Sequence, residues 1–384
     1  MSNAPIVIIG TGLAGYSLAR EFRKLDKETP LLLISRDDAV SYSKPMLSTG
    51  FAKQKTADEL AMADVGKMAT QLNASIRNFT EVDRIDTEAK QLTIKNEVVP
   101  YSRLVLATGA SVNKLKFPGS DLPGVFSIND LADYRAFREA LKPNARVLIM
   151  GAGLIGCEYA NDLLVGGHSI TIADPAATAL NGLVPEPAGN ALVKGLEGAG
   201  VTFKFGRFVA SLTNNNSDLG GLSATLDDGS VIETDIVISA VGLKPDLSLA
   251  TSAGLECERG IITNRAMETS APDVFALGDC AQIDGHVMLY VLPLMASARA
   301  LAKTLSGERT EVSYGVMPVA TKTPACPVVV VPPLANTGEW TFEQDGQNIK
   351  GLFKDGDQIH GFVLTGDFAS EKQALAKVTS KIHD

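Results

Sequence analysis

The stretch IVIIGTGLAG (residues 6–15) places a run of four apolar residues directly before a glycine-rich turn. A continuous apolar run of this length is typical of a parallel strand that is buried on both faces. Gly10 would allow a tight turn, Gly12 would leave room for a pyrophosphate, and Gly15 would let the following helix approach the strand. The sequence therefore predicts a dinucleotide-binding turn here, with a glycine-rich packing turn as the alternative. The predicted contacts are Gly10, Thr11, Gly12, Leu13, Ala14 and Gly15.

A second apolar run at Leu31–Ile34 predicts the next strand, and its end is where a ribose-binding carboxylate is expected. Ser35 and Arg36 stand at that position instead, and both are predicted cofactor contacts. Asp37 reaching the ribose and Arg36 stacking on the adenine both remain open at this point.

The stretch GAGLIG (residues 151–156) repeats the pattern after the apolar run Arg146–Met150. Its predicted contacts are Gly151, Gly153, Ile155 and Gly156. The strand Ser169–Ala173 follows, and Asp174 stands at its end, where an acidic residue binds the ribose 2′-hydroxyl. At about 4 Å and an effective dielectric near 20, a 2′-phosphate would be repelled by roughly 4 kcal/mol. This site is therefore predicted to prefer NAD over NADP, with a merely solvated carboxylate as the alternative.

The composition excludes several classes of function. The chain has 384 residues, a net charge of −9 and a sequence pI of about 5.1, which leaves no basic excess for nucleic-acid phosphates. The amino-terminus enters an apolar strand without a basic region before it, and no stretch is long and apolar enough for a membrane span. The four cysteines and four histidines are scattered, so a cytoplasmic protein without a metal site is expected.

Three further segments extend the pattern: LVLATGA (Leu104–Ala110), AVGLKPDLSLA (Ala240–Ala250) and TSAPDVFALGDC (Thr269–Cys280). With both glycine turns, in this order, the chain resembles the two-dinucleotide-binding flavoprotein superfamily that includes glutathione reductase. The resemblance implies FAD at the first turn and NADH at the second. It also implies an α/β fold of two Rossmann-like three-layer dinucleotide-binding domains plus a small α+β carboxyl-terminal domain.

The same resemblance implies where the domains and further contacts lie. The FAD domain would comprise residues 1–110 and 240–310, with the NAD domain at 111–239 inserted into it and the carboxyl-terminal domain at 311–384. Asp279 would bind the ribityl chain, and the adenine would lie near a strand at Glu81–Val82. Further implied contacts are Thr108, Gly109, Gly242, Gly278 and Val291. The segment Asn214–Gly221 is predicted to be a surface loop.

The segment SYSKPMLSTGF (Ser41–Phe51) contains no cysteine where disulfide reductases of this superfamily carry a redox pair. Thiol chemistry at the flavin is therefore not expected, and the cysteines are expected to be small buried side chains. Lys44 would instead lie near the flavin and stabilise negative charge on its reduced form. Glu158 matches a family glutamate near the nicotinamide, and we expect a Lys44–Glu158 ion pair between the two rings.

The tail carries TKTPACPVVV (Thr321–Val330). Together with YSKPMLS it is similar to the rubredoxin reductases and flavorubredoxin reductases, which makes Lys322 a candidate flavin contact. The resemblance implies that NADH reduces the flavin, which then passes single electrons to rubredoxin in a small transient complex. The short tail favours a monomer. A flavorubredoxin or ferredoxin acceptor, a small quinone or organic radical, and an NADH-dependent assembly role are the alternatives.

Overall fold

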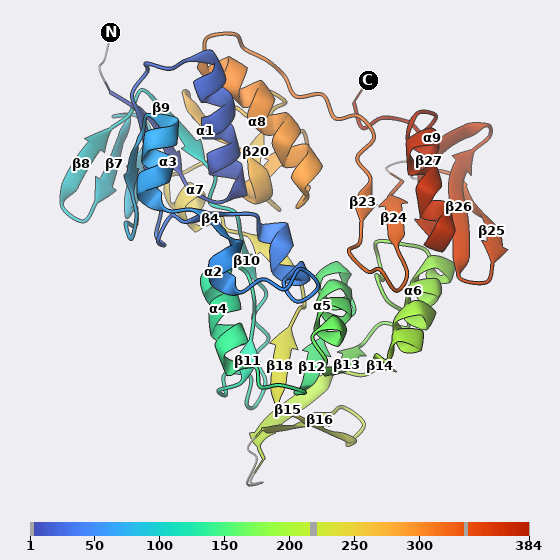
Figure 1. The fold of residues 1–384 in the computed structure, drawn as a ribbon. Coiled ribbons are helices and arrows are strands. Elements are labelled where there is room, and N and C mark those ends of the chain that lie inside the picture. Colours follow the sequence, from blue (N-terminus) through green and yellow to red (C-terminus); the bar gives the residue numbers. More distant parts are fainter. Residues whose placement is uncertain (1–3, 216–220, 334–336, 384) are drawn as a thin grey trace.

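Each glycine-rich turn lies at the carboxyl end of the middle strand of a parallel sheet. The computed structural model describes residues 4–215, 221–333 and 337–383 (Figure 1). Part of the loop that the sequence predicts at Asn214–Gly221 therefore lies outside the described residues.

The first five-stranded sheet has strands from both ends of the first 300 residues. Its order is β21 (Val274–Ala276), β9 (Arg103–Leu106), β1 (Ile6–Ile9), β2 (Leu31–Ile34) and β5 (Ser75–Arg77). The four residues of β1 are all buried, as the unbroken apolar run predicts. Helices α1 (Leu13–Leu25) and α8 (Val291–Leu305) pack against each other over this sheet, with α3 (Val65–Leu72) beside them (Figure 1). A small antiparallel sheet of β6 (Arg84–Asp86), β7 (Gln91–Ile94) and β8 (Glu97–Pro100) shares the same core.

The second five-stranded sheet is built from the middle of the chain. Its order is β11 (Val125–Phe126), β18 (Ile236–Ser239), β12 (Arg146–Met150), β13 (Ser169–Asp174) and β14 (Thr202–Phe205). Its helices are α4 (Leu131–Ala140), α5 (Leu154–Val165) and α6 (Glu186–Ala199), and an antiparallel sheet of β15 (Val209–Asn214), β16 (Leu222–Leu226) and β17 (Val231–Thr234) adjoins it. The mixed α/β class predicted from the sequence is confirmed by this arrangement.

Short elements lie outside the two large sheets. They are β3 (Ser41–Tyr42), η1 (Lys44–Thr49), α2 (Ala57–Leu60), β4 (Ala61–Ala63), β10 (Ala110–Val112), β19 (Leu243–Pro245), α7 (Ser248–Ser252), β20 (Ile261–Thr263), η2 (Gly278–Cys280) and β22 (Ala281–Ile283). The pair β10–β19 is antiparallel and marks where the chain leaves the first sheet and returns to it. The domain boundaries given above remain predictions. The β10–β19 pair contains both the segment that leaves the first sheet and the segment that returns to it, so it does not mark a single boundary residue.

The carboxyl-terminal sheet is antiparallel and has both faces covered. Its order is β23 (Val319–Ala320), β24 (Val328–Val331), β27 (Gln358–Thr365), β26 (Asn348–Asp355) and β25 (Glu339–Asp345), followed by η3 (Gly366–Glu371) and α9 (Lys372–Ala376). Val328 and Val330 enter the core that contains Leu192 of α6, whereas Val329 and Val331 face the opposite side. This alternation is the period-two pattern of a strand between two apolar layers.

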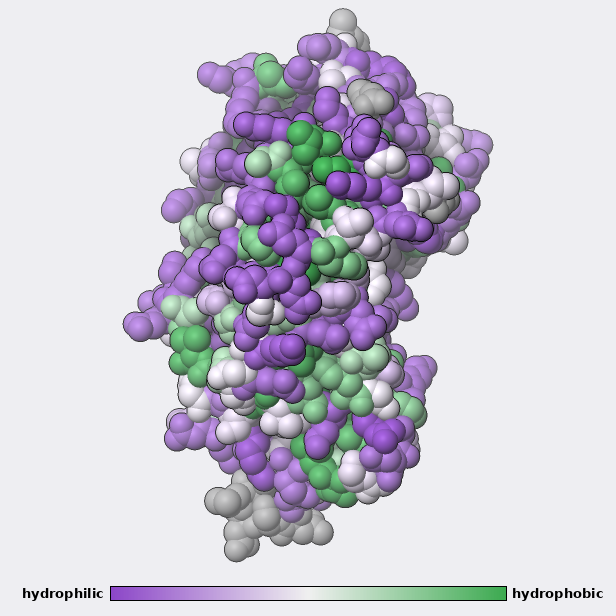
Figure 2. All heavy atoms as spheres, turned by 90° about the vertical axis from the view of Figure 1, so that its right-hand side faces the viewer, coloured by the Kyte–Doolittle hydropathy of each residue, from purple (hydrophilic) through white to green (hydrophobic). Residues whose placement is uncertain are grey.

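The surface turned toward the viewer in Figure 2 is mainly hydrophilic, with apolar side chains in separate patches. None of the described helices is long and apolar enough to cross a membrane.

One predicted strand is wrong. Glu81 and Val82 lie in the irregular segment between β5 and β6, and the strand begins only at Arg84. Val82 is nevertheless buried, because its side chain packs into the core of the first sheet.

Candidate functional site

A cavity of about 1880 Å³ runs between the two large sheets and reaches the carboxyl-terminal domain. Typical small-molecule sites have volumes of about 300–1000 Å³, so this cavity has room for two dinucleotides. Most of the predicted contacts line it: Gly10, Thr11, Gly12, Leu13, Ala14, Ser35, Arg36, Lys44, Val82, Thr108, Gly109, Gly151, Gly153, Ile155, Glu158, Asp174, Gly242, Asp279, Val291 and Lys322.

Three predicted contacts do not line the cavity, because they pack between elements instead. A Cβ at Gly15 would lie 1.9 Å from the carbonyl oxygen of Gly10, and one at Gly156 would lie 2.0 Å from that of Gly151. A Cβ at Gly278 would lie 2.7 Å from the Ala14 side chain. These glycines allow helix and strand to approach, which shapes the turns that face the cavity.

Both turns offer a cradle for phosphate. An added Cβ at Gly12 or Gly153 would meet nothing within 4 Å, and neither glycine has a side chain that could cap its helix. The first backbone N–H groups of α1 and α5 are therefore free for a ligand, and each helix N-terminus carries roughly half a positive charge. The two turns thus fit the pyrophosphates of two dinucleotides.

Asp174 fastens the second turn to the end of β13. Its carboxylate accepts hydrogen bonds from the Ala152 N–H at 2.6 Å and from the Ala176 N–H at 2.7 Å. A carboxylate has further lone pairs, so it can also accept from a ribose hydroxyl, and that role stays a prediction.

The first turn has a different arrangement at the corresponding position. Ser35 accepts a hydrogen bond from the Thr11 hydroxyl at 2.7 Å and donates to Asp37 at 2.5 Å. The Arg36 guanidinium lies 3.4 Å from the carboxylate of Asp246, and its side chain is largely exposed. Neither of the two roles left open for Asp37 and Arg36 is excluded by these contacts, since both residues line the cavity.

The expected ion pair between Lys44 and Glu158 is wrong. Glu158, which is 1% exposed on α5, binds the Lys322 ammonium at 2.5 Å and accepts a hydrogen bond from the Ser48 hydroxyl at 2.6 Å. The other carboxylate oxygen of Glu158 accepts a hydrogen bond from the backbone N–H of Lys322 at 3.0 Å. Lys322 and Ser48 thus occupy the Glu158 carboxylate, and Lys44 does not contact it.

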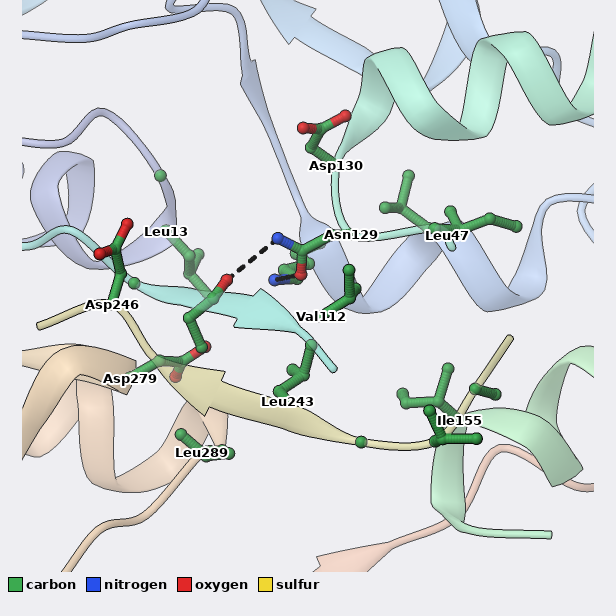
Figure 3. A pocket seen from close by; sticks show the side chains of 18 of the residues that line it. Leu13, Leu47, Val112, Asn129, Asp130, Ile155, Leu243, Asp246, Asp279 and Leu289 are labelled. Atoms are coloured by element: carbon green, nitrogen blue, oxygen red, sulfur yellow. Dashed lines mark hydrogen bonds between the residues drawn. The ribbon is translucent and has the colours of Figure 1, made fainter. Parts of the chain in front are cut away.

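Lys44 points to the other side of the cavity, where its ammonium donates to Asn129 Oδ1 at 2.7 Å. Burial lowers the pKa of Lys44, while the charges of Asp279, Asp130 and Asp133 oppose that shift. Figure 3 shows Asn129 and Asp279 at this cavity, on segments far apart in the sequence.

Asp279 has the chemistry expected of a ribityl contact. Burial raises the pKa of its carboxyl group, and the nearby Lys44 lowers it. Its side chain lines the cavity, and no hydrogen-bond donor to it is found among the described residues. A buried carboxylate that lines the cavity and has no donor from the protein is suited to accept hydrogen bonds from ligand hydroxyl groups.

Sequence reasoning missed Ser48 and Asn129. Ser48 follows Lys44 within η1 and carried no motif of its own. Asn129 directly precedes Asp130, the N-cap of α4. Asp130 was the signal in the sequence that could have pointed to Asn129. A helix-capping residue fixes the turn before the helix, and so it also fixes the positions of the polar residues beside it.

The cavity is not lined by any cysteine among the described residues. Burial raises the pKa of Cys157 to about 12 and also raises that of Cys280. Cys257 is only half-buried, unlike the three other cysteines. The described residues contain no group of three or more His, Cys, Asp or Glu side chains placed to hold a metal.

Two known protein families match most of the chain. Residues 4–300 match the family described as pyridine nucleotide-disulphide oxidoreductase, and residues 311–379 match the rubredoxin binding C-terminal domain. The rubredoxin-NAD(+) reductase of Alcanivorax borkumensis is 50% identical, over 97% of this chain and 98% of that protein. The nitric oxide reductase FlRd-NAD(+) reductase of Vibrio vulnificus is 35% identical over 98% of both chains.

The solved structure of a covalent putidaredoxin reductase–putidaredoxin complex has a TM-score of 0.88, with 24% identity, over 98% of this chain and 94% of that chain. At this identity the likeness concerns the fold alone. The family match over residues 4–300 and the identity over nearly full length lead to one conclusion: this chain belongs to the pyridine nucleotide-disulphide oxidoreductase family.

Proposed function

We propose that this protein is an FAD-dependent reductase that takes electrons from NADH and passes them to rubredoxin. The observation that carries the proposal is the position of Lys322. It belongs to the segment that matches the rubredoxin-binding domain, and its side chain lines the same cavity as both glycine turns. The segment that matches the rubredoxin-binding domain therefore contributes a residue to the lining of the cofactor cavity.

The first turn would hold the FAD pyrophosphate, and the second that of NADH. When bound, FAD would supply the change from two-electron to one-electron transfer, so that one NADH would reduce two oxidised rubredoxins and yield NAD⁺ and a proton. The chain's own contribution is binding and orientation, because the reaction requires neither a covalent intermediate on the protein nor an acid–base residue. Asp279 would bind ribityl hydroxyls, and Lys44 would stabilise negative charge.

NADH rather than NADPH is the proposed donor, because Asp174 ends β13 and lines the cavity, and an acidic residue at this position would bind a ribose 2′-hydroxyl and repel a 2′-phosphate. A flavorubredoxin is the second candidate acceptor, favoured by the relative named nitric oxide reductase FlRd-NAD(+) reductase. The higher identity to the rubredoxin-NAD(+) reductase favours rubredoxin. The unpaired cysteines suit the reducing cytoplasm.

The experiment is anaerobic stopped flow. The FAD-loaded protein is reduced with NADH and mixed separately with oxidised rubredoxin, with a flavorubredoxin, with a ferredoxin and with a small quinone. We expect rubredoxin to be reduced fastest, and NADPH in place of NADH to give a much lower kcat/KM. Fast reduction of ferredoxin or quinone while rubredoxin stays oxidised would contradict the proposal.

A further inference from the structure

Lys44 and Lys322, two of the three lysines that line the cavity, differ in the groups that their ammonium groups contact. The Lys322 ammonium lies 2.5 Å from the Glu158 carboxylate and also donates to the Pro45 carbonyl at 2.7 Å and the Ser48 hydroxyl at 2.9 Å. The Lys44 ammonium donates to the neutral amide oxygen of Asn129. Among the carboxylates of the described residues, none forms an ion pair with Lys44.

The orientation of the Asn129 amide is fixed by its other contacts. Its Nδ2 donates to the Ala110 carbonyl oxygen at 3.0 Å, as Figure 3 shows. Its backbone N–H donates to Asp133 at 2.9 Å, and Asp133 in turn donates its own N–H to Asp130 at 2.8 Å. Because the amide nitrogen is committed to a carbonyl, the amide oxygen has to face Lys44.

The carboxylates around Lys44 would otherwise compete for its ammonium. Asp130 Oδ1 caps α4 and Asp133 Oδ2 accepts the Asn129 N–H, so one oxygen of each carboxylate is engaged and its side chain is held at the start of α4. Asp279 acts on Lys44 through its charge and has no such engagement. Without the bond to Asn129, the flexible lysine would be free to pair with Asp279.

We propose that Asn129 is a positioning residue that holds Lys44 through a neutral acceptor, so that Lys44, unlike Lys322, presents to the bound flavin an ammonium without a direct ion-pair partner. A positive charge there favours the negatively charged reduced flavin and raises its midpoint potential. The paired charges of Lys322 and Glu158 largely cancel. The inference rests on the proposed function only in requiring that FAD occupies the first site.

The test is a redox titration of the FAD-loaded protein, which needs no acceptor protein. We compare the parent with Lys44→Met, Asn129→Leu and the double variant. Leucine has nearly the size of asparagine but cannot accept a hydrogen bond. We expect each single variant to have a more negative midpoint potential, and Asn129→Leu to have no further effect once Lys44 is absent.

A second variant guards against loss of folding. Asn129→Asp keeps the shape and turns the neutral acceptor into an ion-pair partner of Lys44, so it should also lower the potential, with bound FAD checked by absorbance. An unchanged potential in Asn129→Asp overturns the inference. An Asn129→Leu effect that persists in full without Lys44 also overturns it, since the role would then be structural. Failure to reduce rubredoxin would leave these potentials unaffected and would concern the proposed function alone.

Discussion

Gly153 and Gly156 belong to the same turn but have different surroundings. At Gly153 a methyl group would meet no protein atom within 4 Å, and the backbone is extended rather than left-handed. At Gly156 it would lie 2.0 Å from the Gly151 carbonyl oxygen. The first glycine therefore leaves space for the ligand, and the second for the packing of α5 on its strand.

Alanine at these two positions should separate binding from folding. We expect Gly153→Ala to keep the melting temperature of the parent while weakening NADH by about 1–3 kcal/mol, the usual cost of overfilling a packed site. Gly156→Ala should lower the free energy of unfolding by a similar amount. Thermal melts and the KM for NADH decide the matter. Equal losses of melting temperature in both variants would show that the two glycines do not differ in this way.

Most of the contacts predicted from sequence patterns line the cavity, but the partners of its charged residues were not predicted. The glycines and Asp174 follow local rules of strand, turn and helix, so their places can be derived from neighbours in the chain. Lys44 and Glu158 were paired wrongly because Lys322 reaches Glu158 from a segment far along the sequence. Local patterns contain no information on such competition.

Helix α5 connects the cofactor turn to the lysine-bearing segments. Its buried polar residues Glu158, Asn161 and Asp162 lie on it within two turns. Asp162 accepts the N–H groups of Phe51 and Ala52 after η1, and Asn161 accepts that of Ala325. The sequence analysis singled out Glu158 but not Asn161 or Asp162, since polar side chains on a helix resemble a solvent-facing stripe until their backbone partners are known.

The carboxyl end of α5 should make stability sensitive to acid. His168 is 6% exposed, and its Nδ1 accepts the Ala145 N–H at 3.2 Å. Burial, followed by the charge of Arg138, lowers the pKa of His168 below its usual 6.5. A base whose pKa is lower in the folded state stabilises the fold above pH 6.5 and loses that contribution as the pH falls toward its folded value.

We therefore expect the parent to lose free energy of unfolding between pH 7.5 and pH 5.5 more steeply than His168→Gln does. Urea unfolding at both pH values measures this, with the partly exposed His360→Gln as a matched control that should keep the parent's slope. Parallel pH dependence in the parent and His168→Gln would rule out this role for His168.

At the scale of the whole molecule, three segments meet at one buried carboxylate. Glu158 comes from α5, which packs on the second sheet, Ser48 comes from η1, and Lys322 comes from the loop between β23 and β24. The α/β class and the three-part layout were implied by the family resemblance that the motifs carry. The junction could not, because the apolar core that α6 shares with β24 follows from tertiary packing rather than from any single pattern.

This junction should respond unequally to loss of its two charges. Lys322→Met would leave Glu158, which is 1% exposed, as an uncompensated buried charge, and breaking such a pair costs about 3–5 kcal/mol. Glu158→Gln should cost less, since the Lys322 side chain is 34% exposed and keeps its bonds to Pro45 and Ser48. The double variant should be more stable than Lys322→Met alone, because no charge is then buried without a partner. Thermal melts of the FAD-loaded proteins measure all three, and a double variant that loses the sum of the single losses would show that Glu158 and Lys322 stabilise the junction independently.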